Sequence, residues 1–210
     1  MIKYFSLFFV LVLLAQANQV NLTPTLPAID MTLDGKKIHI SRMQDSNHKL
    51  RNEYTLTSRL SPPFEIQPYS MMEGIETISE LEVFDFIQHK LKKGALLIDA
   101  RLESWFYQSS IPAAINIPFP SISAMDNNAT LERLGILHDT DTLDFSQAKD
   151  LLIFDNGPWC PQATLHIEAL VTLGYPKEKI IYYRGGMQYW SILGLIYAYP
   201  KEVPTNKGTH

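Results

Sequence analysis

The sequence predicts an α/β fold: a three-layer α/β/α sandwich around a mostly parallel sheet, preceded by a small N-terminal β-hairpin extension. Two observations lead to this prediction. Short apolar runs of buried-strand type alternate with helix-like segments from residue 77 to residue 195, an order typical of parallel sheets. Near the start of the chain, Asp34-Gly35 separates two alternating apolar runs, which is a strong hairpin signal.

The hairpin is expected within residues 28–42, where apolar residues alternate from Ile29 to Ile40. Its turn needs positive φ at both central residues, a conformation that Asp and Gly tolerate. Because two strands alone are marginal in water, the hairpin is expected to pack on the main domain or on a partner. Residues 43–73 have no sustained period and contain three prolines, which predicts a connector lying over a surface.

A helix is expected to begin after Ser79, because Ser79 and Glu82 have the spacing of a capping box. The apolar residues expected to recur along its buried face are Leu81, Phe84, Ile87 and Leu91. After it we expect a buried strand at residues 95–99, a second strand at 114–117, a weaker helix at 121–134 and a polar loop at 135–149.

The segment with the clearest signals runs from Leu151 to Trp190. It predicts a buried strand at Leu151–Phe154, a tight loop with the only cysteine, a helix at Gln162–Leu173 and a strand at Ile180–Tyr183, before a Gly-Gly turn into an aromatic helix. In parallel sheets, functional pockets lie at the carboxyl ends of the strands. The loop at residues 155–160 is therefore the first place to look for chemistry.

The composition is that of an ordinary globular protein, with 46% hydrophobic and 19% charged residues in a chain of 210. A net charge of −4, without a cluster of Lys and Arg, argues against a nucleic-acid or polybasic membrane partner. No two of the six histidines share metal-ligand spacing, so neither a metal site nor a cofactor is expected.

The first residues predict a cleaved signal peptide. A cationic start at Lys3 is followed by the apolar run Tyr4–Leu14 and by Ala15-Gln16-Ala17, the small-x-small pattern of a cleavage site. Cleavage after Ala17 would give a periplasmic or secreted protein without stable membrane insertion. In that oxidising compartment a single cysteine is buried, paired with another molecule, or reactive, and the sequence leaves these alternatives open.

Four stretches, in family order, resemble the rhodanese-like (sulfurtransferase) domain family. They are residues 96–101 (LLIDAR), 110–118 (SIPAAINIP), the strand, loop and helix around 155–160, and 184–187 (RGGM) followed by Trp190. The loop also resembles that of a secreted bacterial single-domain subgroup with an NGPWC loop. The organisation that follows is a signal peptide at 1–17, the hairpin and connector at 18–76, a rhodanese-like domain at 77–197 and a tail at 198–210.

The resemblance implies sulfane-sulfur transfer, in which a loop cysteine attacks a donor such as thiosulfate and carries a persulfide to an acceptor. The implied partners are a small sulfur-containing anion or a thiol protein. The usual nucleophile position, directly after the strand, is Asp155 here, and a carboxylate cannot form a persulfide. In the secreted subgroup, cysteines flank the Pro62-Pro63-Phe64 segment, whereas Ser61 and Glu65 stand there in this chain.

These departures favour a degenerate module with a binding or regulatory role. The alternative is a periplasmic sulfurtransferase or thiol-redox protein that uses the displaced Cys160. Cys160 precedes Pro161, a residue favoured at a helix start, so a helix dipole is expected to lower the pKa of its thiol. The competing interpretation is a small packed residue beside Trp159. Whether the chain is an enzyme stays open.

The other candidate residues each have two interpretations. Asp155 either contacts a cation or partner or is satisfied by nearby backbone N–H groups. Asn156 and Gly157 bend the strand into the helix, and Gly157 is also suited to close approach of a ligand. Arg101 and Arg184 either line the mouth of the pocket or stabilise the loop beneath it. Trp159 belongs to an aromatic rim or to the core.

Overall fold

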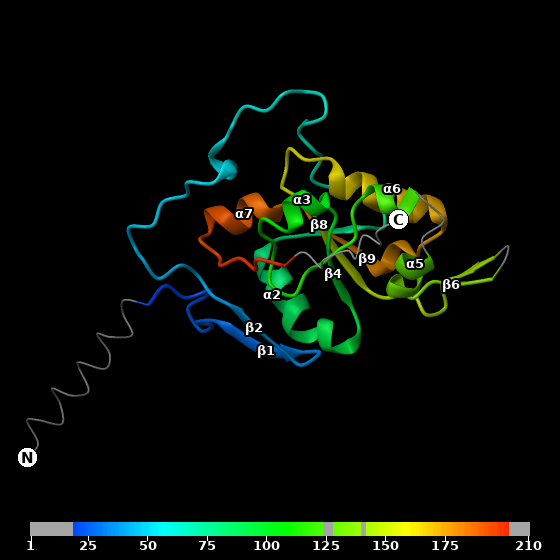
Figure 1. Ribbon diagram of the computed structural model, residues 1–210, viewed down its shortest axis with the longest axis horizontal. Helices are drawn as coiled ribbons and strands as arrows, with labels where there is room; N and C mark the ends of the chain where they lie inside the picture. Colours follow the sequence, from blue (N-terminus) through cyan, green and yellow to red (C-terminus); the bar gives the residue numbers. More distant parts are fainter. Residues whose placement is uncertain (1–18, 124–127, 140–141, 202–210) are drawn as a thin grey trace, which may run out of the picture.

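The computed structural model describes residues 19–123, 128–139 and 142–201, so the predicted signal peptide lies outside the described residues. Its centre is a five-stranded sheet in the order β3-β9-β8-β4-β5. In that order the strands are Glu76–Ile78, Ile180–Tyr183, Leu151–Phe154, Leu96–Asp99 and Ile115–Asn116. Every neighbouring pair is parallel, which confirms the predicted sheet (Figure 1).

Helices cover both faces of the sheet and create two cores. The helices are α2 (Glu80–His89), α3 (Glu103–Phe106), α4 (Pro120–Ser123), α5 (Asn128–Leu134), α6 (Gln162–Leu173) and α7 (Gly186–Ile192), with short 3-10 turns at η1 (Glu53–Thr55), η2 (Leu91–Lys93) and η3 (Lys177–Lys179). Strand β8 shows the division: Leu152 and Phe154 pack with α2 and α7, whereas Leu151 and Ile153 pack with α5 and α6. Because successive strand residues point to opposite faces, each face of the sheet packs against its own helices, and the molecule has three layers: helices, sheet and helices.

The N-terminal hairpin consists of β1 (Ile29–Leu33) and β2 (Lys36–Ile40). Asp34 and Gly35 have φ values of 48° and 75°, as the predicted turn requires. Ile29 and Ile40 are buried in the core on the α2 side of the sheet, and the hairpin lies beside α2 (Figure 1). The domain itself therefore supplies the packing that a two-stranded hairpin needs.

Helix α2 begins as predicted, with both halves of the Ser79–Glu82 capping box present. One residue of its expected buried face is misplaced, because Leu81 is 59% exposed. The buried face is formed by Val83, Phe84, Phe86 and Ile87. At 100° per residue Leu81 lies about 140° from the centre of that face, so it points to solvent.

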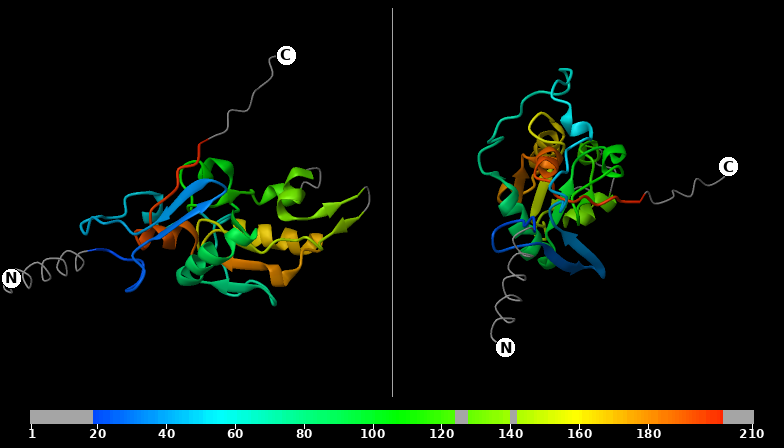
Figure 2. Two further views of the ribbon diagram at one scale, coloured as in Figure 1. Left: turned by 90° about the horizontal axis from the view of Figure 1, so that it is seen from below. Right: turned by 90° about the vertical axis from the view of Figure 1, so that its left-hand side faces the viewer.

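Three short strands escaped the sequence analysis. Strand β3 is a three-residue edge strand, and the segment expected as a polar loop at 135–149 contains the short hairpin of β6 (Leu137–His138) and β7 (Leu143–Asp144). This hairpin projects from one end of the molecule (Figures 1 and 2). Among the residues that the structure describes, none of the helices has the length and apolarity needed to cross a membrane.

Candidate functional site

The predicted site residues come from the carboxyl ends of three neighbouring strands. Arg101 follows β4, Asp155 follows β8 and Arg184 follows β9. In the sheet register Phe154 pairs with both Asp99 and Tyr183. The residues that follow the three strands therefore leave the sheet at the same edge.

The Asp155 carboxyl group fills the concave side of the loop at residues 155–160. Its Oδ1 accepts the N–H of Gly157 at 2.9 Å and its Oδ2 accepts the N–H of Ala163 at 2.8 Å. Asp155 is completely buried. Burial raises the pKa of Asp155 to about 7, against the opposing effect of these two N–H bonds. The backbone N–H groups that would face an anionic ligand thus hold a side chain of the protein itself.

The Gly185-Gly186 turn packs directly on this loop. The N–H of Met187 donates to the carbonyl of Asp155 at 3.0 Å, and that of Gln188 to the carbonyl of Asn156 at 2.9 Å. A Cβ on Gly186 would lie 2.4 Å from the Asp155 carbonyl oxygen, and one on Gly157 would lie 3.0 Å from the Gly185 carbonyl oxygen. The close approach at Gly157 is therefore to the chain's own backbone.

A buried network fixes the loop from below through Arg101. Arg101 binds Asp99 in a bidentate manner, with Nε–Oδ1 at 2.9 Å and Nη2–Oδ2 at 2.6 Å. Its Nη1 donates to the Tyr54 hydroxyl at 3.0 Å, and that hydroxyl donates to Asn156 Oδ1 at 2.9 Å. Its Nη2 also donates to the Ser109 carbonyl at 2.6 Å. These contacts lock Asn156 to the end of β4.

Arg101 is 0% exposed, so it does not line the mouth of a pocket. Burial alone would lower the pKa of Arg101, but Asp99 more than offsets this, and the pKa lies above its ordinary value. Every nitrogen of its guanidinium has a protein partner. The geometry is that of an ion pair which supports the loop.

Cys160 lies inside the protein, just before the first turn of α6. It is 0% exposed, and Asn156 Nδ2 donates to its sulfur at 3.5 Å. Burial raises the pKa of the Cys160 thiol, and the neighbouring Asp155 carboxylate raises it further. The expectation of a pKa lowered by the helix start is therefore wrong, because burial and a nearby negative charge outweigh the helix dipole.

The connector covers the outer side of the loop. The Arg59 guanidinium lies 3.6 Å from the centre of the Trp159 ring, and Phe64 meets the same ring edge-to-face at 5.2 Å. Trp159 is half-buried beneath them and donates from Nε1 to Gln188 Oε1. Figure 1 shows the connector arching outward and returning beside the loop between β8 and α6. The ring of Trp159 is thus covered by side chains of the connector.

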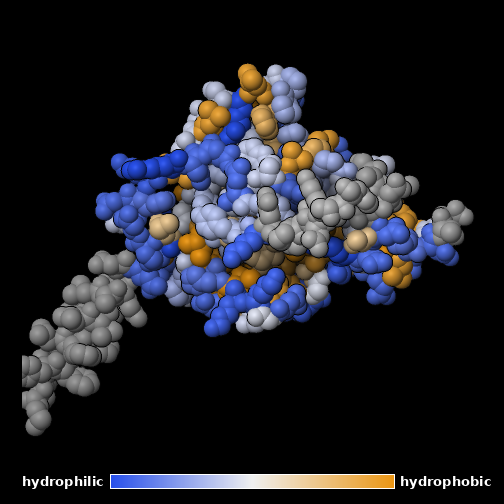
Figure 3. Space-filling model, viewed as in Figure 1, coloured by the Kyte–Doolittle hydropathy of each residue, from blue (hydrophilic) through white to orange (hydrophobic). Residues whose placement is uncertain are grey.

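Backbone and side-chain contacts of Gln67 fasten the returning connector. Its N–H donates to the Pro158 carbonyl at 2.8 Å, and its carbonyl accepts Arg184 Nη2 at 2.8 Å. Its side-chain oxygen accepts the Thr164 hydroxyl at 3.2 Å. Arg184 therefore holds the connector in place. The outer side of the connector exposes Leu56, Leu60 and Ile66, and apolar side chains are visible along that edge (Figure 3).

Sequence reasoning missed the connector residues Tyr54, Arg59 and Gln67. Each lies in an aperiodic segment, and its contacts depend on where the chain folds back. One local signal was available: Asn52 caps η1 by accepting the Tyr54 N–H at 3.1 Å, and Asn is a favoured capping residue.

Among the described side chains, no group of three His, Cys, Asp or Glu residues could hold a metal ion.

This fold and site define a class of protein: a parallel α/β domain with a tight loop after a central strand. Backbone N–H groups of the loop and of the start of the next helix point to the concave side of the loop and form an N–H cradle. The family model of the rhodanese-like domain matches residues 85–193. The chain therefore belongs to the rhodanese-like domain family.

Several solved structures are similar to part of the chain. A Bacillus halodurans protein is 21% identical with a TM-score of 0.44, covering 63% of this chain and 86% of its own. A rhodanese-related protein from Thermoplasma volcanium is 18% identical with a TM-score of 0.38, covering 60% and 99%. A single-domain sulfurtransferase from Saccharomyces cerevisiae is 18% identical with a TM-score of 0.41, covering 57% and 91%. No curated protein matches the sequence.

Proposed function

We propose that this chain is an exported rhodanese-like module that has lost sulfane-sulfur transfer and acts in binding or regulation. The observation that carries the proposal is the position of Asp155, whose two carboxyl oxygens take the N–H groups of Gly157 and Ala163. A carboxyl group cannot carry a persulfide. It also fills the space in which a thiosulfate oxyanion would be bound.

The surroundings of the loop support the same function. Arg59 and Phe64 cover Trp159, and Arg184 donates to the carbonyl of Gln67. The groups that could receive a small sulfur-containing anion therefore already have partners within the chain. Ser61 and Glu65, which stand where the related subgroup has cysteines, bond to each other at 3.0 Å.

The test is thiosulfate:cyanide sulfurtransfer by the purified protein. In this reaction a cysteine thiolate attacks the outer sulfur of thiosulfate and releases sulfite, and cyanide then removes the outer sulfur as thiocyanate. We expect no turnover above the uncatalysed rate for the wild type or for Cys160→Ser. Asp155→Cys, which places a thiol at the N–H cradle, is expected to gain measurable thiocyanate formation. Wild-type turnover that Cys160→Ser abolishes would contradict the proposal.

The second candidate, a sulfurtransferase or thiol-redox protein using Cys160, is favoured only by the position of this thiol beside Asn156. The accessibility of Cys160 separates the two candidates. In the folded protein a thiol reagent should label Cys160 far more slowly than in urea, because the side chain is fully buried. Rapid labelling, a persulfide mass shift or a mixed disulfide with a partner would favour the second candidate.

The proposed export rests on the cationic start, the apolar run and the Ala15-Gln16-Ala17 pattern of the first residues. Expression of the full chain in a bacterium should give a periplasmic protein that begins at Asn18. Intact mass spectrometry of the soluble product checks this, and a product that keeps residues 1–17 would argue against export by a cleaved signal.

A further inference from the structure

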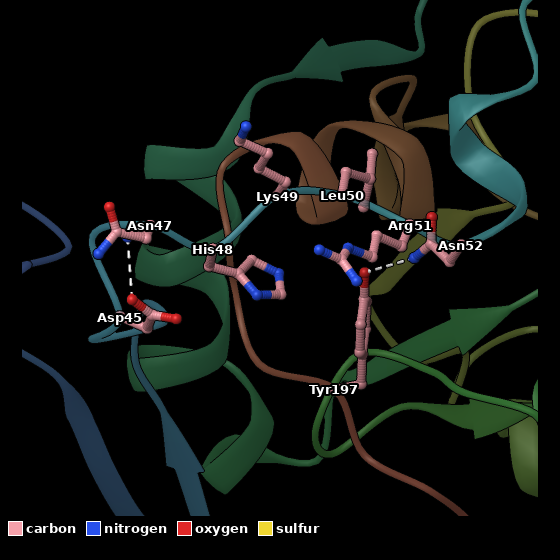
Figure 4. A pocket seen from close by; sticks show the side chains of 8 residues that line it. All are labelled: Asp45, Asn47, His48, Lys49, Leu50, Arg51, Asn52 and Tyr197. Carbon is pink, nitrogen blue, oxygen red and sulfur yellow. Dashed lines mark hydrogen bonds between the residues drawn. The ribbon is translucent and has the colours of Figure 1, made fainter.

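A hollow of about 520 Å³ lies away from the β8–α6 loop, between the start of the connector and the C-terminal segment. Its lining comes from Asp45, from residues 47–52 and from Tyr197. Figure 4 shows His48 and Arg51 pointing toward each other across the hollow, with the Tyr197 ring beside Arg51. Lys49, which also lines the hollow, extends away from His48 and Arg51. The volume is in the range of small-molecule sites.

This hollow lies outside the segment that the family model matches. The family match covers residues 85–193, and every lining residue lies outside that range. Two hydrogen bonds hold its wall in shape. Asn52 donates to the Tyr197 hydroxyl at 3.0 Å, and the Tyr197 hydroxyl donates to the Ser191 hydroxyl at 2.7 Å. The start of the connector and Tyr197 thus form a separate hollow beside the end of α7.

The polar groups facing the hollow favour an anion. Arg51 is exposed, and no ion pair engages it within the described ranges. The single carboxylate of the lining, Asp45, lies on the far side of His48 from Arg51 (Figure 4) and accepts the Asn47 N–H at 2.9 Å. A guanidinium and an imidazole that face each other form a set of donors suited to a carboxylate or phosphate placed between them.

We propose that this hollow binds a small organic anion whose carboxylate or phosphate lies between Arg51 and His48, and whose body lies against the ring of Tyr197. The Tyr197 hydroxyl is already engaged on both sides, so the contribution of Tyr197 to the ligand is its ring. The site is independent of sulfur transfer and of the thiol of Cys160.

The test uses the full chain with three probes of similar shape: benzoate, phenyl phosphate and the uncharged benzyl alcohol. Titrations followed by two-dimensional NMR of the ¹⁵N-labelled protein should show saturable shifts at residues 45–52 and at Tyr197 for an anion. The tighter of the two anions identifies the recognised group. Arg51→Gln should weaken that binding roughly tenfold or more, because a charge-assisted hydrogen bond is lost.

Lys92→Gln is the matched control, since it removes the same charge from an exposed side chain that is not part of the lining of the hollow. It should change affinity less than about twofold at ~0.15 M salt, where exposed charges are screened. Three results would overturn the proposal: equal weakening by both variants, equal binding of benzyl alcohol, or no saturable shift at about 10 mM probe, a concentration that detects even millimolar affinity.

Discussion

Replacing Arg101 with methionine is expected to lower the free energy of unfolding by about 3–5 kcal/mol. Asp99 is 0% exposed, and Arg101 makes two direct bonds to its carboxylate. Removal of the guanidinium leaves a buried negative charge whose remaining partners are the Ser110 hydroxyl and the backbone N–H of residue 101. It also removes a donor from Tyr54 and Asn156. Urea denaturation of wild type and variant measures the difference.

Lys90→Met provides the matched control. Lys90 Nζ lies 3.2 Å from Asp150, but both side chains are substantially exposed, so the loss should stay below about 1 kcal/mol. The double variant Asp99→Leu/Arg101→Met removes both charges and should regain part of the stability lost in Arg101→Met. An Arg101→Met loss no larger than that of Lys90→Met would show that the buried pair does not support the loop as the geometry indicates.

Local signals explain why much of the fold was predictable. The Asp34-Gly35 turn, the Ser79–Glu82 capping box and the apolar run of β8 each specify their own backbone. Strands β3, β6 and β7 are two or three residues long, too short to show a period. They become strands through pairing with other segments, which the sequence alone does not show.

The candidate site divides in the same way. Asp155 could be recognised from its place directly after a strand, where backbone N–H groups of the loop and of the following helix are close enough to be its partners. Tyr54 and Arg59 could not, because they reach the loop only through the path of an aperiodic connector. The error at Cys160 arose because its sequence position indicates a helix start, whereas the pKa of a thiol depends on burial and on neighbouring charge.

The stability that Asp155 contributes is expected to fall as the pH rises. Its pKa is raised from 3.8 to about 7 in the folded protein, so the folded state holds the proton more tightly than the unfolded chain. The contribution is present in full below pH 3.8 and is lost as the pH passes through about 7. The pKa rise of about three units, at about 1.36 kcal/mol per unit, corresponds to a loss of about 4 kcal/mol in the free energy of unfolding. Urea unfolding of wild type and Asp155→Asn from pH 4 to pH 8 measures it.

The comparison with Asp155→Asn is needed because His166 acts in the opposite direction. Burial lowers the pKa of His166 to about 3, so its contribution is present above about pH 6.5 and is lost as the pH falls. Both proteins contain His166, and its effect cancels in the difference between their unfolding free energies. That difference should decline toward neutral pH. A flat difference would mean that the N–H bonds from Gly157 and Ala163 outweigh burial, so that Asp155 stays ionised in its cradle throughout this range.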